Sequence, residues 1–191
     1  MTGWGSHELQ RIQDGDPQAW RRLIERAHGR LYRFLLHLTG CPEDAEDLVQ
    51  EAFVRLWERR LDWRFTHLRE LQAWLHRVVH HCAVDRARRL QRAAAAPGEA
   101  ELHPVASPAD AIAARSDEAR AVWEAVQALG DIHRLPVLLH YFGGLGCAEI
   151  ATVLDVPRGT VISRLHTARA RLRETLSAQG VTGYELSTAG E

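Results

Sequence analysis

Hydrophobic and polar positions follow a helical period most clearly between Gly146 and Leu176 (GCAEIATVLDVPRGTVISRLHTARARLRETL). In the second part of this stretch an apolar stripe recurs every three or four residues: Val161, Leu165, Ala168, Leu172 and Leu176. The opposite face is small or polar: Gly159, Ser163, His166, Thr167 and Ala170. Arginines fill its sides and far end: Arg158, Arg164, Arg169, Arg171 and Arg173. The pattern predicts a helix with one buried side and one basic, solvent-facing side.

A shorter helix precedes this one, with a buried side formed by Ile150, Ala151, Leu154 and Val156. Pro157 suits the first position of the second helix, where its missing N–H costs nothing. This is the pattern of a helix-turn-helix, whose second helix enters a DNA major groove. The alternative is an ordinary helical hairpin with a solvated basic face. The short first helix, the tight turn, the proline and the arginine stripe together favour DNA binding.

Two long helices are predicted near the N-terminus, from Asp16-Pro17 to about Leu38 and from Pro42 to about Arg60. The second has a predicted buried side: Leu48, Val49, Ala52, Phe53, Leu56 and Trp57. Its other face is largely acidic: Asp47, Gln50, Glu51, Val54 and Glu58. Spacing alone favours a solvated polar face here, and the functional alternative is a docking surface for a basic partner helix.

The connection LDWRFTHL (residues 61–68) mixes aromatic and basic side chains. Trp63, Arg64, Phe65 and His67 together suit a pocket for an unstacked base, because aromatic rings and guanidinium planes stack on bases. The alternative is that Trp63 and Phe65 only cap the core. The sequence does not favour one interpretation over the other.

A third helix, from about Arg69 to Arg92, is apolar on one side and basic on the other. The core side is predicted as follows: Leu71, Leu75, Val78, Val79 and Cys82. The basic side and its neighbours offer a second surface for phosphates: Arg77, His81, Arg86, Arg88, Arg89 and Arg92. His76 and His80 lie one turn apart, but two ligands are too few for a metal site, so we expect no bound metal.

The segment 93–114 is rich in alanine and proline with few large apolar residues, which predicts a linker at a domain boundary. Helices are expected again up to Gly130, near His133–Phe142 and in the helix-turn-helix. Residues 1 to about 8 and the tail 177–191 are expected to be unstructured. No segment alternates with period two. The sequence therefore predicts an all-α protein with two small helical domains joined by a flexible linker, the second domain containing the helix-turn-helix.

Composition excludes several functions. All 24 residues in the Lys+Arg total are arginines, which excludes a Walker phosphate loop and lysine Schiff-base chemistry. The net charge of −1 says nothing about a polyanionic partner, whereas the local arginine stripes do. Three widely spaced cysteines do not form a disulfide framework and suit a reducing compartment. No signal peptide or run of membrane-spanning length is present, so a cytoplasmic protein without membrane insertion is expected.

Three strings resemble a known family. DAEDLVQEAFVRLWER (44–59) resembles the core of the first conserved domain of bacterial RNA polymerase sigma factors, and WLHRVVHHCAVDRARR (74–89) resembles the promoter-melting helix of that domain. HYFGGLGCAEIATVLDVPRGTVISRLHTARARLR (140–173) resembles their second conserved domain. The chain is similar to a small, two-domain, extracytoplasmic-function (ECF) member of the sigma-70 family, over about residues 10–92 and 115–176.

The resemblance implies roles for particular residues. Residues 10–92 would form the region 2 domain and residues 115–176 the region 4 domain. The polymerase-binding surface would be Asp47, Gln50, Glu51 and Val54. Minus-ten DNA would be bound and melted by Trp63, Phe65, His67, Arg77, His81, Arg86 and Arg88. The minus-thirty-five element would be read by Arg158, Thr160, Ser163, Arg164 and His166.

The implied function is promoter-specific transcription initiation with core RNA polymerase, without enzymatic activity or a cofactor. The implied partners are core RNA polymerase, promoter DNA and an anti-sigma factor. The alternative is a stand-alone helix-turn-helix regulator with an N-terminal sensor or dimerisation domain, although a small-molecule sensor has no need of a second basic helix. A third alternative, a hydrolase that uses the histidines for catalysis, is not supported by any motif in the sequence.

Four positions depart from the family pattern. Ile162 stands where a basic residue is usual, so one phosphate contact is expected to be lost. His81 replaces a frequent asparagine on the melting helix, which puts the minus-ten preference in doubt. Gly146 stands where a serine often caps the helix, while Glu149 keeps half of the capping box. Asp155 replaces a common glycine at the turn, which is tolerable because aspartate adopts the left-handed conformation.

Overall fold

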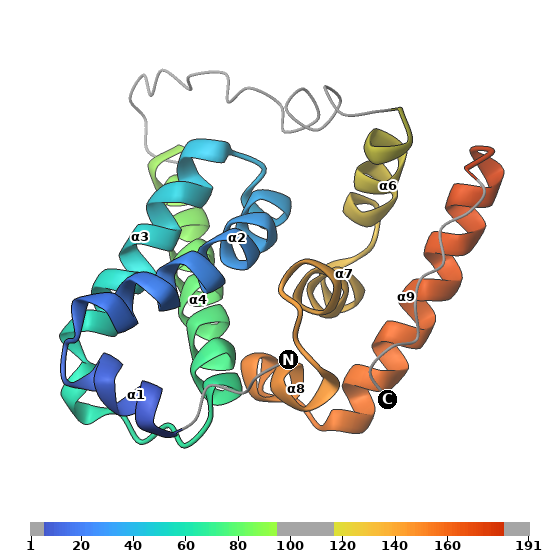
Figure 1. Cartoon of the computed structure of the whole chain (residues 1–191). Coiled ribbons are helices and arrows are strands. Elements are labelled where there is room, and N and C mark those ends of the chain that lie inside the picture. Colours follow the sequence, from blue (N-terminus) through green and yellow to red (C-terminus); the bar gives the residue numbers. More distant parts are fainter. Residues whose placement is uncertain (1–5, 95–116, 182–191) are drawn as a thin grey trace. The chain divides into compact units, whose positions relative to one another are not determined.

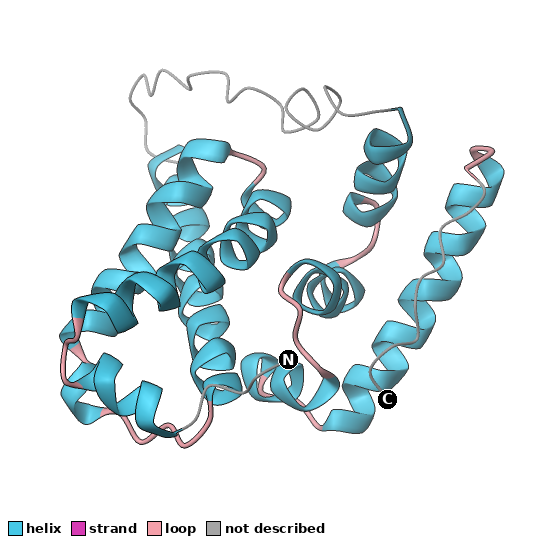
Figure 2. Ribbon diagram, viewed as in Figure 1, coloured by secondary structure: helices cyan, strands magenta, loops and turns pink. Residues whose placement is uncertain are grey.

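The computed structural model describes residues 6–94 and 117–181, and every regular element within these ranges is helical (Figure 2). The all-α prediction is therefore confirmed for this part of the chain. The chain divides into two compact units, with the division between Val105 and Ala106. Most of the predicted linker (93–114) and most of the predicted loose tail (177–191) lie outside the described residues. At their described edges both segments continue helices, α4 to Ala94 and α9 to Ala178.

The first unit is built from four α-helices and one short 3-10 turn among its described residues (Figure 1). They are α1 (Ser6–Gln13), α2 (Pro17–Thr39), α3 (Pro42–Glu58), η1 (Arg60–Asp62) and α4 (Leu68–Ala94). Helices α2, α3 and α4 pack against one another, while α1 packs on α2 and η1. Their shared core consists of fully buried aliphatic and aromatic side chains, among them Leu23, Leu31, Phe34, Leu35, Leu48, Leu56, Leu71 and Leu75. This three-helix core fixes the outward faces of α3 and α4.

The ends of α2 follow the local sequence signals. The Asp16 carboxylate accepts hydrogen bonds from the backbone N–H groups of Gln18 (2.8 Å) and Ala19 (3.1 Å), which caps the first turn. Gly40 ends the helix at φ 79°, a left-handed conformation that glycine adopts without steric cost, and its N–H donates to the carbonyl of Leu36. Pro42 then begins α3. The predicted bounds of α2 are confirmed within one residue.

The N-terminal prediction was wrong, because α1 begins at Ser6, inside the segment expected to be unstructured. Its two apolar residues, Leu9 and Ile12, are buried, and the indole N–H of Trp20 donates to the carbonyl of Ile12 (2.7 Å). Glu8 pairs with Arg22 of α2 at 2.7 Å. Two apolar positions in eight residues are too few to reveal a helical period, and the stabilising contacts come from α2.

The second unit consists of α6 (Asp117–Gln127), α7 (Asp131–Val137), the π-helical turn η2 (Leu138–Phe142), α8 (Cys147–Leu154) and α9 (Arg158–Ala178). Helix α9 packs against α6, α7 and α8, so it is the centre of this unit. Its predicted apolar stripe is confirmed: Val161, Leu165, Ala168, Leu172 and Leu176 are all buried. Pro157 lies one position earlier than predicted, immediately before the first helical residue of α9.

Candidate nucleic-acid interface

The outer face of α3 is exposed, acidic and partly apolar. Asp47 has 65% of its side chain exposed, and Val54 is 56% exposed. Gln50 is also exposed, and Glu51 is half-buried with an ion pair to Arg55 one turn later (2.5 Å). The four residues predicted to bind polymerase therefore lie on one solvent-facing side of one helix. This combination of carboxylates with an exposed valine suits a basic partner helix that also carries apolar residues.

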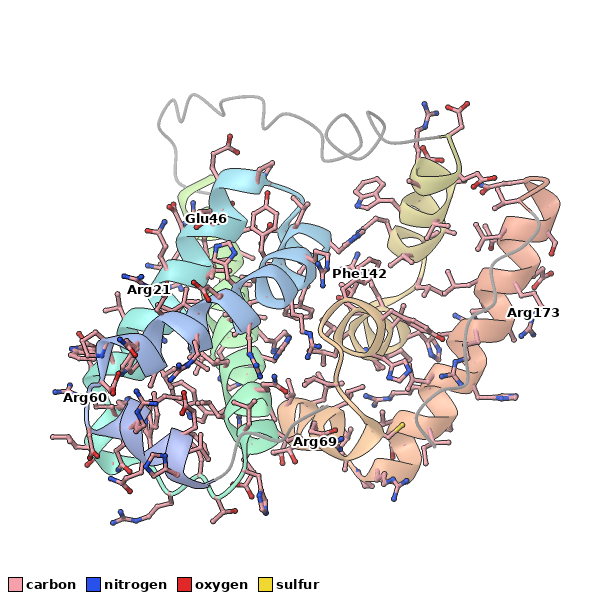
Figure 3. All side chains as sticks on the ribbon, in the orientation of Figure 1. Arg21, Glu46, Arg60, Arg69, Phe142 and Arg173 are labelled. Atoms are coloured by element: carbon pink, nitrogen blue, oxygen red, sulfur yellow. The ribbon has the colours of Figure 1, made fainter. Side chains whose placement is uncertain are left out.

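Trp57 was predicted to be buried, and that prediction was wrong because 43% of its surface is exposed. Its ring packs edge-on against Trp20 (centroids 5.0 Å apart), and the guanidinium of Arg60 lies 4.1 Å from its centroid. Arg60 is labelled in Figure 3. Trp57, Trp20 and Ile24 line an open, largely apolar hollow of about 430 Å³. The apolar stripe of α3 therefore extends beyond the buried core and ends in a partly exposed tryptophan.

The loop between η1 and α4 divides its side chains between core and solvent. Trp63 is only 8% exposed and packs against Trp20 (6.1 Å between centroids) and Phe65 (5.7 Å). Phe65 in turn contacts Trp74 of α4 at 6.1 Å. In contrast, Arg64 and His67 are exposed. The structure therefore brings the predicted loop residues together, with Trp63 and half-buried Phe65 directed into an aromatic cluster.

The basic side of α4 contains both exposed and internally paired residues. Arg77, His81 and Arg88 are exposed, as predicted for a surface that faces DNA. Arg86 is different, because its guanidinium donates to the carboxylate of Asp44 on α3 and lies 3.8 Å from Asp47. The sequence places Arg86 among the DNA-binding residues, whereas in the folded chain its charge faces two carboxylates of α3.

Two histidines of α4 are withdrawn from solvent. His76 is 3% exposed; its Nδ1 lies 2.8 Å from the carbonyl of Gln72, and its Nε2 has no hydrogen-bond partner among the described residues. Burial lowers the pKa of His76 to about 4, and burial also lowers the pKa of His80. Within residues 6–94 and 117–181, no group of three or more potential ligands is arranged to hold a metal ion. These histidines are therefore neutral parts of the helical packing near neutral pH.

The turn between α8 and α9 has the conformation that its sequence predicts. At the start of α8, the backbone N–H of Gly146 donates to the Glu149 carboxylate at 2.8 Å, which is the half of the capping box that the sequence keeps. Asp155 ends α8 at φ 53° and ψ 51°, so the expected left-handed conformation is confirmed. The N–H of Val156 then donates to the carbonyl of Ala151 (3.1 Å). The left-handed Asp155 and the Val156 hydrogen bond form the tight turn between the two helices.

The exposed face of α9 begins at its first residue. Arg158, Ser163 and His166 are exposed, whereas Thr160 and Arg164 are half-buried. All five predicted minus-thirty-five residues thus lie within the first nine positions of one helix. Arg169 is held further along by the Tyr141 hydroxyl of η2, to which its Nε donates at 3.0 Å. Arg173, labelled in Figure 3, lies near the far end of the helix. The first turns of α9 therefore present polar side chains to solvent, as does its far end, where Arg171 and Arg173 are exposed.

Among the helices of residues 6–94 and 117–181, none combines the length and the apolar composition that spanning a bilayer requires. The family model described as Sigma-70 region 2 matches residues 23–93, which include α3 and all but the last residue of α4. The model described as Sigma-70, region 4 matches residues 119–172, which include α8 and most of α9.

Curated relatives match across both units. The chain is 35% identical to the ECF RNA polymerase sigma factor SigL of Mycobacterium tuberculosis over 164 residues, which cover 85% of this chain and 91% of that protein. It is 26% identical to the ECF RNA polymerase sigma factor SigW of Bacillus subtilis over 179 residues, covering 88% and 94% of the two chains.

Solved structures share the fold. The structure of CnrH in complex with the cytosolic domain of CnrY matches with a TM-score of 0.65 and 23% identity, covering 91% of this chain and 97% of that one. The sigma factor RpoE in complex with the anti-sigma factor NepR, from Bartonella quintana, matches with a TM-score of 0.63 and 22% identity, covering 82% and 96%.

Proposed function

The chain belongs to the sigma-70 family, in its ECF group, and from this premise we propose how its surfaces share the work of transcription initiation. As an ECF sigma factor, it binds core RNA polymerase and directs initiation at specific promoters. The proposal assigns a function to each domain: residues 10–92 bind polymerase and open the minus-ten element, and residues 115–176 recognise the minus-thirty-five element. The observation that carries it is that the first unit has an exposed acidic face on α3 and an exposed basic face on α4, while the second unit has an exposed basic face on α9.

Polymerase docking is proposed for Asp47, Gln50, Glu51 and Val54. Their shared face combines negative charge, which steers a basic partner toward it, with an exposed valine that gains from desolvation. None of these side chains lies in the buried core of the unit, so changing them should leave the fold intact. Asp47 lies 3.8 Å from Arg86 of α4, so folding of its variant is checked directly.

The docking face is tested by Asp47→Arg and Val54→Arg in a binding titration with purified core polymerase. We expect each variant to bind at least about tenfold more weakly, because a like charge or an unpaired charge in an interface costs more than about 1.4 kcal/mol. The matched control is Asp14→Arg, which makes the same charge change at an exposed position after α1. Circular dichroism checks that all three variants are folded. Unchanged affinity of both α3 variants would remove this face from the interface.

Minus-ten binding is proposed for the exposed side of α4 together with the loop that precedes it. Arg77, His81 and Arg88 are available for phosphates and bases. In the loop, Arg64 and His67 are available to an unstacked base, and the buried Trp63 anchors the backbone next to Arg64. Duplex opening needs such a place for the extruded base together with phosphate contacts that steady the strand.

Minus-thirty-five recognition is proposed for Arg158, Thr160, Ser163, Arg164 and His166. Residues at the start of the second helix are the ones that reach base edges when a helix-turn-helix docks in the major groove. Arginine is suited to the paired acceptors of guanine. We expect Arg164→Ala to lower run-off transcription from a cognate promoter without changing core polymerase affinity. Equal transcript levels for the wild type and Arg164→Ala would show that Arg164 does not contribute to minus-thirty-five recognition.

The two proposed DNA surfaces lie in different units of one chain, so the segment between the units tethers them. Polymerase, by holding both units, converts two weak contacts into one strong contact through effective concentration. A stand-alone regulator would bind its operator without polymerase, so DNA affinity with and without core enzyme distinguishes the two functions.

The proposal extends to partners and location. The solved structures of similar fold hold CnrH with the cytosolic domain of CnrY and RpoE with the anti-sigma factor NepR, which supports an anti-sigma factor as a regulatory partner of this chain. We further propose that the protein acts in the cytoplasm, where its polymerase is, and that it is not itself an enzyme and needs no cofactor.

A further inference from the structure

The loop that is proposed to receive the unstacked base is held at both ends. At its start, the rings of Trp63 and Phe65 lie in a row with Trp20 and Trp74, with centroids 5.7 to 6.1 Å apart. These contacts fix the backbone on either side of Arg64, because neither ring can leave without exposing aromatic surface to water. The first half of the loop is therefore anchored by packing.

The end of the loop is anchored by one carboxylate, that of Glu70 in the first turn of α4. Glu70 Oε2 accepts hydrogen bonds from the backbone N–H groups of Thr66 (2.7 Å) and His67 (3.3 Å). The Thr66 hydroxyl lies 3.2 Å from both carboxylate oxygens. These contacts, the Thr66 N–H bond first among them, lower the pKa of Glu70, so the carboxylate is ionised at neutral pH. A charged acceptor makes such bonds stronger than neutral ones.

Arg64 and His67 are exposed, and the backbone around them is fixed by the aromatic row on one side and by Glu70 on the other. We propose that Glu70 is a positioning residue for promoter opening, which holds the loop ready to receive the unstacked base. This inference rests on the proposed function of the loop. Glu70 itself points to backbone groups of the loop and is not offered as a base contact. A loop already ordered in its bound shape loses less conformational freedom when the base arrives.

The test uses the full chain assembled with core polymerase, on a promoter selected from random-sequence DNA with the wild-type holoenzyme. Three quantities are measured: core affinity, affinity for double-stranded promoter before opening, and the opening rate from 2-aminopurine fluorescence in the minus-ten element. We expect Glu70→Ala to slow opening by about tenfold while the two affinities change less than about twofold, because preorganisation acts on the step that uses the loop. Glu70→Gln, which keeps an acceptor oxygen, should recover most of the rate.

The matched control is Asp62→Ala, which removes one negative charge at an exposed position of η1 just before the loop. We expect it to open the promoter like the wild type. A normal opening rate with Glu70→Ala would overturn the positioning role, as would an equal loss of core affinity, which would indicate only damage to the helix start. If the wild-type chain fails to open any promoter with core polymerase, the proposed function itself fails, independently of Glu70.

Discussion

Arg86 on α4 donates a hydrogen bond to the carboxylate of Asp44, in the first turn of α3. A second carboxylate of α3, that of Asp47, lies 3.8 Å from the same guanidinium. The side chains of Arg86 and Asp44 are 36% and 23% exposed, so this pair is partly shielded from water. The residue expected to bind DNA and the helix expected to bind polymerase are thus joined by an ion pair.

This pair should contribute measurably to the stability of the first unit. A double-mutant cycle with Arg86→Gln and Asp44→Asn, followed by urea unfolding, should give a coupling energy of about 1 kcal/mol, because the pair is charge-assisted and partly shielded. The cycle also cancels the separate effect of Asp44 on the α3 dipole.

The exposed pair Arg88–Asp85 within α4, at 3.8 Å and with both side chains more than 60% exposed, provides the control for that cycle. Its coupling energy should be about 0.3 kcal/mol or less. Equal coupling energies for the two pairs would mean that Arg86 does not brace α4 against α3.

Arg77 and Arg86 should differ in the salt dependence of DNA binding. Among the ion pairs of the described residues none involves Arg77, whereas Arg86 faces two carboxylates. Holoenzyme affinity for a single-stranded minus-ten oligonucleotide is measured from low to high salt. Arg77→Ala should reduce the slope of log affinity against log salt by about 0.7, the value for one phosphate contact on a single strand. Arg86→Ala should change this slope clearly less. Equal changes in slope for the two variants would indicate that Arg86 also contacts DNA phosphate directly.

The sequence was sufficient for the features that depend on local pattern. The stripe from Val161 to Leu176 predicts the buried side of α9, and the break at Gly40-Cys41-Pro42 marks the boundary between α2 and α3. The left-handed Asp155 also follows from its own chemistry and position. In each case the cause lies within a few residues of the effect, so one sequence contains the information.

Features that depend on distant partners could not be predicted in this way. Asp44 and Arg86 are 42 positions apart, and nothing in either local pattern indicates that they meet. Trp57 continues the apolar stripe of α3, but the core ends before it. The hydrogen bonds from the loop backbone to Glu70 were also not predicted. Its spacing from His67 is that of a capping box, yet the usual serine or threonine at the cap is replaced by histidine.

Acid should destabilise the first unit through His76. Its pKa is lowered to about 4 by burial, with the charge of Arg30 acting in the same direction, whereas the ordinary pKa of histidine is 6.5. The unfolded chain therefore takes up a proton as the pH falls below 6.5, while the folded chain does so only near pH 4. The contribution to stability is complete above pH 6.5, and about 3 kcal/mol is lost by pH 4.

His76→Leu should remove this part of the pH dependence. Urea unfolding of the full chain at pH 7.5 and pH 5.0 should show a loss for the wild type that is about 2 kcal/mol larger than the loss for the variant. Leucine is of similar size, and it removes the buried Nε2 that lacks a partner among the described residues. The exposed His81 supplies the control, since His81→Leu should keep the full loss. Parallel losses for wild type and His76→Leu would contradict a neutral, buried His76.

Ile162→Arg should strengthen DNA binding by the second unit. Ile162 is 43% exposed on α9, close to Arg158 and Arg164, so an arginine fits there without disturbing the core. Holoenzyme binding to a minus-thirty-five duplex should gain a phosphate contact and a salt slope steeper by about 0.9. Ser177→Arg adds the same charge at the exposed far end of α9 and should leave the slope unchanged. An identical increase for both variants would indicate a general charge effect.

Promoter binding by this chain should depend on polymerase. The measurement is fluorescence anisotropy of a labelled promoter with the purified chain, with and without core enzyme. We expect binding by the chain alone to be at least about 100-fold weaker than binding by the assembled holoenzyme, because polymerase holds both DNA surfaces at a fixed separation. Equally tight promoter binding by the chain alone, or no association with core enzyme at all, would contradict the claim.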